Sequence, residues 1–500
     1  MLFTTSAFVF LFMPVVFVGF FVAARFSRAV AAVWLCLASL YFYGYWAPKF
    51  VPLLLSSIAV NFVVGSRISR ASLSPKRELS RSVARRWLIA GVIFNLALLG
   101  YFKYHNFFVE NANTILGTHF GLSQVVLPIG ISFYTFTQIA FLADAYQRGT
   151  SEYKLSHYGL FVTYFPHLIA GPVLHHAQIM PQFGSAETYR LQLDAVAGGL
   201  VIFTIGLIKK VVFADVVSPY ADAVFHAADA GQGVIASEAW LGAFAYTFQL
   251  YFDFSGYCDM AVGVSRLFNV QLPYNFDSPY KAASITDFWR RWHMTLSAFL
   301  RDYLYIPLGG NRAGSIRRYI NLMITMLLGG LWHGASWTFV FWGGLHGIYL
   351  MVNHGYRAMA TKYIPTLSAS KAHRVISIGV TFFAVLAAWV FFRAHTFSGA
   401  SIILHSIVDV SSFSWPDAPH PALWNAGLSP GRGWAWCMAL GLVAFFGPNS
   451  NWIGERTLLA CRSSPAVRYF LLGASLISCI FLVIVNESRD VVSPFIYYNF

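Results

Sequence analysis

Long apolar runs separated by short basic loops dominate the chain. A helix needs about 20 apolar residues to cross the hydrocarbon core of a bilayer, and runs near that length recur from the first residues to the last. The runs that predict spanning or partly spanning helices are residues 6–24, 31–46, 51–65, 87–101, 196–212, 239–264, 319–350, 375–392, 434–446 and 469–485. They predict an all-α polytopic membrane protein with about eleven to thirteen spans or partial spans.

Two further apolar runs contain residues that break helices. Residues 125–144 hold Pro128 and Gly130, and residues 160–173 hold two prolines that flank His167. Irregular backbone at membrane depth is tolerated only where protein buries it or where it lines a wet cavity. These runs predict re-entrant or broken helices, and they leave the topology between residues 125 and 214 open.

The charges in the loops predict the orientation. Cytoplasmic loops are enriched in Lys and Arg, and residues 67–86 hold seven such bases with Glu78 as the only acid. Residues 357–374 and 456–468 are basic as well, whereas residues 215–238, which we interpret as a linker, and residues 396–431 contain acids and no bases. Both chain ends are therefore predicted outside the cytoplasm, with short helices over residues 266–318 on the cytoplasmic side.

Composition agrees with a membrane protein. Hydrophobic residues make up 57% of the 500 residues and charged residues only 11%, against about a quarter in soluble domains. The net charge of +14 does not indicate nucleic-acid binding, because the bases lie in loops between spans. The five cysteines show no paired spacing, and no metal-ligand motif is present. We expect one integral membrane domain, divided along the chain into 1–112, a catalytic core 113–360, 361–485 and an extracytoplasmic tail 486–500.

The candidate chemistry is concentrated between Phe288 and His346. His333 lies in the sequence Gly-Gly-Leu-Trp-His-Gly, between apolar runs. Burial disfavours a charged imidazole, so a neutral His333 could accept a proton as a general base. The alternative is a packed histidine whose ring is hydrogen-bonded to the backbone. His346 has a structural and a functional interpretation of about equal weight.

Other polar residues are weaker candidates. His293 could orient a substrate or polarise a carbonyl, or it could belong to an interfacial helix anchored by tryptophans. His167 is an intramembrane polar group and a second-rank candidate. Asp253 and Asp259 are expected to pair with arginines of residues 266–318. Three arginines could bind an anionic donor such as coenzyme A phosphates, or they could reflect the charge bias of cytoplasmic loops: Arg290, Arg291 and Arg301.

The sequence resembles the membrane-bound O-acyltransferases. The residues that carry the resemblance are FWRRWHMTLSAFLRD (288–302) followed by LGGLWHG (328–334). Four further segments resemble the alginate O-acetylation branch of that family: LPIGISFY (127–134), FPHLIAGPV (165–173), QLYFDFSGYCD (249–259) and YLYIPLGGNR (303–312). The similarity covers most of the chain to about residue 392 and weakens afterwards.

The resemblance implies a helical funnel across the bacterial inner membrane. His293 and His333 match the two active-site histidines of the family, and His167 matches a histidine that alginate-type members need. Trp332 and Asp302 are expected to support the pair. The donor would be acetyl-CoA from the cytoplasm, with no bound cofactor. The acceptor would be an exported polysaccharide, reached through a periplasmic partner with an SGNH-hydrolase-like domain.

The C-terminal sequence Phe-Ile-Tyr-Tyr-Asn-Phe (495–500) resembles an aromatic motif of envelope acylation systems. In that motif a tyrosine is proposed to carry the acyl group, and Tyr497 would be that residue. The alternative is an aromatic belt at the membrane interface. The sequence predicts polysaccharide O-acetylation, most plausibly of alginate. It leaves open a transporter that forms no bond, and an acyltransferase for peptidoglycan, lipid or protein.

Overall fold

The computed structural model describes residues 1–72, 77–151, 154–312, 314–363, 370–409, 411, 419–489 and 493–496. Helices are the only regular elements within those ranges, which confirms the predicted all-α class. Five helical stretches are long and apolar enough to cross a membrane: Ala7–Phe26, Pro48–Ser72, Ser80–Leu116, Lys371–Arg393 and Pro465–Glu487. Shorter apolar helices accompany them, so the protein is a multi-pass membrane protein.

The chain forms two compact units, and each is built from separate segments. The first contains residues 1–206, 257–274 and 454–499, and the second contains residues 207–256, 275–453 and 500. Helix α11 (Ala236–Leu267) contributes its first part to the second unit and its last part to the first. The predicted division into consecutive segments stays a prediction.

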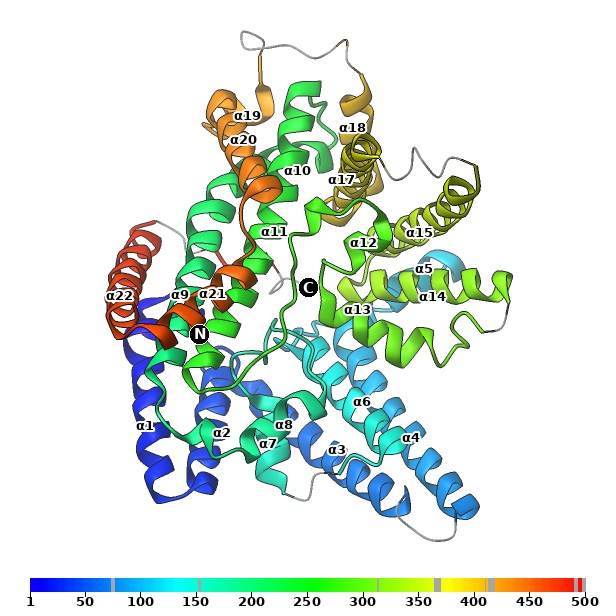
Figure 1. Ribbon diagram of the computed structural model, residues 1–500. Helices are drawn as coiled ribbons and strands as arrows, with labels where there is room; N and C mark the ends of the chain where they lie inside the picture. The colour runs from blue at the N-terminus through cyan, green and yellow to red at the C-terminus, as the bar shows by residue number, and fades with distance from the viewer. Residues whose placement is uncertain are drawn as a thin grey trace. The chain divides into compact units, whose positions relative to one another are not determined.

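The first unit begins with two helix pairs, formed by residues 13–44 and by residues 51–99 (Figure 1). Its main helices are α1 (Met13–Phe26), α2 (Arg28–Gly44), α3 (Val51–Ser72), α4 (Arg77–Leu99), α5 (His105–Leu116), α9 (Leu193–Leu207), α21 (Ser450–Ser463) and α22 (Pro465–Glu487). Asn61 on α3 and Asn95 on α4 exchange hydrogen bonds of 3.2 and 2.6 Å between their side-chain amides. Both residues are fully buried, so each amide satisfies the other inside otherwise apolar helices.

The predicted helix breaks of the first unit are present. Helix α6 (Ile131–Arg148) begins only after Gly130, whose φ is 73°, a conformation that favours glycine. Helix α7 (Leu155–Thr163) ends before Pro166, and irregular backbone follows until α8 (His176–Gly184). Gly171 N–H donates to His167 O at 3.1 Å, and a Cβ at Gly171 would collide with the His167 backbone. The Ala-Gly-Pro sequence therefore permits the tight turn around His167.

The second unit holds the sequence motifs between Phe288 and His346. Its elements are η5 (Ile208–Ala214), α10 (Asp215–Asp229), η6 (Pro279–Lys281), α12 (Ile285–Trp289), α13 (Met294–Leu300), η7 (Arg301–Tyr305), α14 (Ser315–His333), α15 (Trp337–Tyr363), α17 (Lys371–Arg393), α18 (Phe397–Val408), α19 (Pro421–Asn425) and α20 (Pro430–Phe446). The short helices predicted for residues 266–318 are confirmed.

Helices α14 and α15 form a hairpin whose crossing point is made of glycines. The chain turns at Gly334, as predicted, and the two helices pack along each other (Figure 1). A Cβ at Gly330 would collide with the Phe339 carbonyl oxygen, and a Cβ at Gly343 would collide with that of Met326. Only glycine permits so close an approach of two helix backbones. The crossing lies one turn before His333, so it sets the position of that side chain.

Two expectations about polar residues are wrong. Residues 215–238 were expected to be a linker, but Asp215–Asp229 is helix α10, because its apolar residues recur at helical spacing. Asp253 was expected to pair with an arginine of residues 266–318, but it accepts from Lys210 Nζ at 2.6 Å. Lys210 Nζ also lies 2.8 Å from Asp215. A buried lysine thus lies between two carboxylates whose side chains are at most 5% exposed, which offsets the cost of removing these charges from water.

Candidate active site

His293 lies on the turn between α12 and α13, in a conformation that is unusual for its residue type. Its φ of 44° places it in the left-handed region, which non-glycine residues rarely occupy and which is often found at functional sites. The side chain is fully buried, and the ring meets Phe254 edge-on at 4.8 Å between centroids. His293 lies outside the candidate spans, and burial lowers the pKa of its imidazole to about 3. The ring is therefore neutral at physiological pH.

Asn275 fixes the tautomer of His293. The Asn275 Oδ1 atom accepts from Thr295 N–H at 3.2 Å and from Thr295 Oγ1 at 3.0 Å. Because a backbone N–H can only donate, the oxygen of the Asn275 amide must be the atom at this position. The same oxygen lies 3.2 Å from His293 Nδ1, so Nδ1 carries the ring proton. Nε2 then bears the lone pair that can accept a proton or a hydrogen bond.

His333, the last residue of α14, lies next to His293. The ring centroids of the two histidines are 6.4 Å apart, and both side chains are at most 3% exposed. Trp332 meets both rings, at 4.9 Å from His333 and 6.2 Å from His293. The structure thus brings together three residues that the sequence predicted, although His293 and His333 are forty positions apart.

Further aromatic rings, here called the aromatic wall, pack against His333. Its ring contacts Trp342 and Phe392, each with centroids 5.2 Å away. Trp342 stacks on Trp389 at 5.6 Å and meets His346 at 4.9 Å. Two large, well-packed tryptophans therefore hold the imidazole of His333 in a low-dielectric environment, where uncompensated charge is expensive.

The residues of this site lie within a region that matches a known family. The sequence model of the MBOAT, membrane-bound O-acyltransferase family, covers residues 132–394, which is more than half of the chain and includes both histidines. The chain belongs to the membrane-bound O-acyltransferase family. It is therefore an O-acyltransferase, as the resemblance of its motifs predicted.

Curated relatives cover most of the chain. A peptidoglycan O-acetyltransferase of Helicobacter pylori is 43% identical over 441 residues, which are 83% of this chain and 81% of that protein. A probable alginate O-acetylase, AlgI, of Azotobacter vinelandii is 43% identical over 402 residues, 79% of this chain and 75% of the relative. The Pseudomonas aeruginosa protein of the same name is 42% identical over 400 residues, 79% and 72% of the two chains. These similarities confirm the prediction that the chain belongs to the alginate O-acetylation branch of the family.

Two other predicted site residues of this acyltransferase, His167 and Asp302, have hydrogen-bond partners of their own. His167 belongs to the first unit, where its buried Nε2 lies 3.0 Å from Phe161 O. That nitrogen donates to the carbonyl. Asp302 accepts two hydrogen bonds from the neighbouring Arg301, at 2.7 and 3.1 Å. The hydrogen-bond partner that the structure gives for this carboxylate is thus an arginine and not a histidine. Supporting roles for His167 and Asp302 stay predictions.

The arginines predicted to bind the acyl donor differ in whether a carboxylate already pairs with them. Arg291 donates to Asp287 at 2.9 Å and lies 3.7 Å from Asp277, and Arg301 is bound to Asp302. Carboxylates already compensate both guanidinium groups. Arg290 is exposed. Tyr497 lies outside the described residues.

Sequence reasoning missed Asn275 and the aromatic wall. Asn275 stands in a Pro-Tyr-Asn-Phe loop that carries no motif signal, and only the folded turn brings its amide to His293 Nδ1. Trp342 and Trp389 lie on two helices, α15 and α17, that the sequence predicted as apolar runs without assigning a role. A polar residue in a loop rich in proline and aromatics is the only signal that could have drawn attention to Asn275.

Proposed function

We propose that this protein transfers acetyl groups from acetyl-CoA to an exported polysaccharide, alginate, across the bacterial inner membrane. The buried pair of His293 and His333, whose ring centroids are 6.4 Å apart, carries the proposal. The names of two groups of relatives, alginate O-acetylase and peptidoglycan O-acetyltransferase, support acetyl as the group and a polysaccharide as the final acceptor. Peptidoglycan is the second candidate polymer, because a relative named for peptidoglycan O-acetylation is 43% identical over 83% of this chain.

The proposed reaction needs one general base, which takes a proton from the acceptor hydroxyl and then gives it to the leaving thiolate. In the proposal His333 takes the proton of an acceptor hydroxyl as its oxygen attacks the thioester carbonyl carbon. The tetrahedral intermediate collapses, the carbon–sulfur bond breaks, and the new oxygen ester forms. The thiolate of coenzyme A then takes the proton from the His333 imidazolium. The base returns to its neutral form, and no other reactant is needed.

His293 has a role that follows from its tautomer. With Nδ1–H donated to Asn275, the neutral ring presents a lone pair at Nε2. A lone pair can accept from the acceptor hydroxyl or from a second donor, but it cannot donate to a thioester carbonyl. The tautomer therefore favours the orienting role for His293 over carbonyl polarisation.

The later steps of the proposal concern the extracytoplasmic side. Acetyl would pass to Tyr497 in the C-terminal tail, and a periplasmic partner with an SGNH-hydrolase-like domain would move it onto the polymer. The loop charges support an extracytoplasmic position for both termini. Replacing Tyr497 with Phe removes the hydroxyl and keeps the ring, so acetylation of the polymer should stop. Normal polymer acetylation by that variant would remove Tyr497 from the mechanism.

The experiment that tests the proposal uses His333→Ala and the matched control His405→Ala. His405 is an exposed histidine on α18, so its loss should leave acetylation unchanged. His333→Ala should abolish polymer acetylation in cells, and release of coenzyme A from acetyl-CoA by purified protein, while membrane insertion and thermal stability are kept. Undiminished acetylation by this variant would reject the role of His333. Wild-type protein that never consumes acetyl-CoA would instead favour the transporter.

A further inference from the structure

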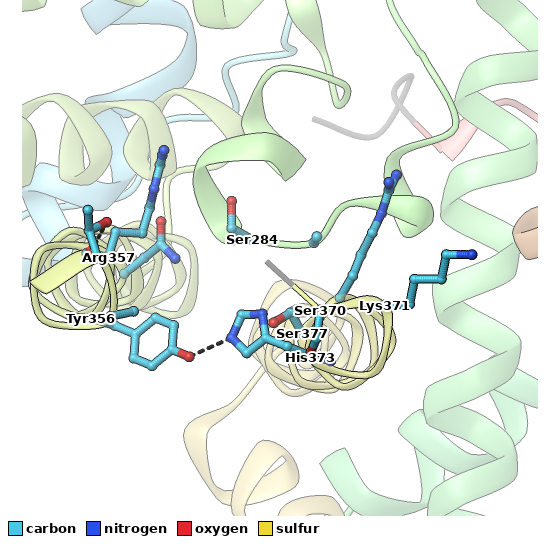
Figure 2. Close-up of a pocket in the computed structure, with 12 residues that line it drawn as sticks. Ser284, Tyr356, Arg357, Ser370, Lys371, His373 and Ser377 are labelled. Atoms are coloured by element: carbon cyan, nitrogen blue, oxygen red, sulfur yellow. Dashed lines mark hydrogen bonds between the residues drawn. The ribbon is translucent and has the colours of Figure 1, made fainter. Parts of the chain in front are cut away.

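A hollow of about 460 Å³ lies in the second unit, between the late turns of α15 and the first turns of α17 (Figure 2). The loop before α12 forms its third wall through Ala283 and Ser284. Most of the twelve lining residues are polar or basic: Ala283, Ser284, Asn353, Tyr356, Arg357, Ala360, Thr361, Ser370, Lys371, His373, Arg374 and Ser377. None of these lining residues is acidic.

Hydrogen bonds hold the walls of this hollow together. Tyr356 and His373 meet across the gap between α15 and α17, with 2.6 Å from Oη to Nε2 and nearly parallel rings (Figure 2). Thr286 Oγ1 donates to Asn353 Oδ1 at 2.9 Å and so ties α12 to α15. Side chains that are held in place lose little entropy when a ligand binds. The hollow is therefore a built feature of the fold.

The positive charge of the hollow has no compensating carboxylate in the neighbouring sequence. The chain contains no Asp or Glu between Asp302 and Asp409. Asp287, on the helix that follows the third wall, is bound to Arg291. The hollow thus presents Arg357 and Arg374 to a ligand, with hydroxyls and amides beside them.

The start of α17 adds a further attraction for anions. A helix N-terminus carries partial positive charge and unsatisfied N–H groups in its first turn. Ser370 caps α17 by accepting from His373 N–H at 3.1 Å, and Ser370 lines the hollow. Lys371 extends away from Tyr356 in Figure 2, so its ammonium lies at the edge of the site. Arginine guanidinium groups beside hydroxyl donors bind phosphate oxygens well.

We propose that this hollow binds a phosphate group, carried either by a nucleotide-type thioester donor or by the headgroup of an anionic phospholipid. The loop charges predict that this end of α15 and α17 faces the cytoplasm, where both ligands are found. Arg357 lies fifteen residues after Trp342, which contacts His333, so it is about 22 Å further along α15 at 1.5 Å per residue. That span is comparable to the length of a pantetheine arm. A phosphate carried by a nucleotide-type donor rests on the proposed acetyl-CoA chemistry, whereas a phosphate carried by a phospholipid does not.

The test uses full-length protein in nanodiscs and three variants. Arg357→Gln and Arg374→Gln each remove one cation from the hollow, and Lys362→Gln removes an exposed cation from α15 that does not line it. Binding of coenzyme A and of 3′-dephospho-coenzyme A is measured in phosphatidylcholine nanodiscs. Thermal stability is measured with and without phosphatidylglycerol. All three side chains are exposed, so each variant should fold.

A nucleotide ligand predicts that each arginine variant weakens coenzyme A binding about tenfold or more, with Lys362→Gln unchanged. A lipid ligand predicts unchanged coenzyme A binding and loss of the stabilisation by phosphatidylglycerol in the arginine variants alone. If neither response differs between the arginine variants and Lys362→Gln, the phosphate site is overturned. That failure is separate from failure of the proposed function, in which wild-type protein would not consume acetyl-CoA at all.

Discussion

Glycine-to-alanine substitutions on α15 should change the stability of the protein in opposite directions, depending on whether the glycine lies at the crossing with α14. Replacing glycine by alanine inside a helix stabilises the helix by about 1 kcal/mol, because alanine loses less backbone entropy. At Gly355 a Cβ would meet nothing within 4 Å, so Gly355→Ala should gain that amount. At Gly343 the Cβ would meet the Met326 carbonyl and Gly330 Cα, and these backbone atoms cannot rotate away.

The size of the Gly343 effect follows from that contact. Overpacking a tight site costs about 1–3 kcal/mol, which offsets or exceeds the gain in helix propensity. Gly343→Ala should therefore be about 1–3 kcal/mol less stable than Gly355→Ala. Because the clash separates α14 from α15 one turn before His333, a displacement of about 1 Å could lower the turnover rate by roughly 100-fold.

A third variant separates backbone contact from side-chain contact. A Cβ at Gly347 would lie 2.8 Å from the Met323 sulfur, and a methionine side chain can rotate to make room. Gly347→Ala should therefore lie between the other two variants in stability and keep most of the activity. Denaturant unfolding in detergent and acetyl-CoA consumption measure the series. Gly343→Ala protein as stable and active as Gly355→Ala would refute the argument that this crossing positions His333.

Two further predictions concern buried polar groups. Asn275→Leu removes the acceptor at His293 Nδ1, so it should lower the rate of acetyl transfer more than it raises the KM for acetyl-CoA. Asn275→Asp keeps an acceptor and should retain more of the rate. Equal rates for the two variants would contradict the tautomer assignment. Lys210→Met leaves two buried carboxylates without their cation and should cost about 3–5 kcal/mol of stability, measured by unfolding in detergent. The control is Lys49→Met at an exposed position, which should be as stable as wild type. A Lys210→Met protein as stable as wild type would contradict the buried ion network.

The elements of this protein could be predicted well because a bilayer imposes length and composition on each span. Hydropathy located α1, α2, α17, α20 and α22 within a few residues, but α3 continues seven residues further and α4 begins ten residues earlier than predicted. Prolines and glycines marked the breaks around His167. Helix ends were less certain, because caps such as Ser27, which accepts from Val30 N–H at 3.1 Å, depend on the local backbone. The interpretation of residues 215–238 as a linker failed because acidic residues on one face hid an amphipathic helix.

The sequence by itself determined the class of the protein and the positions of most apolar helices, and it marked His293 and His333 as candidates, since these depend on residue type and short motifs. Only the tertiary structure decided which residues meet. The left-handed turn at His293, the amide of Asn275, and the glycine crossing that brings α14 to α15 join positions that are far apart in the chain. The partner of Asp253 could not be read from sequence either, because a buried charge pairs with whichever cation the packing of helices places within reach, and here that cation is Lys210.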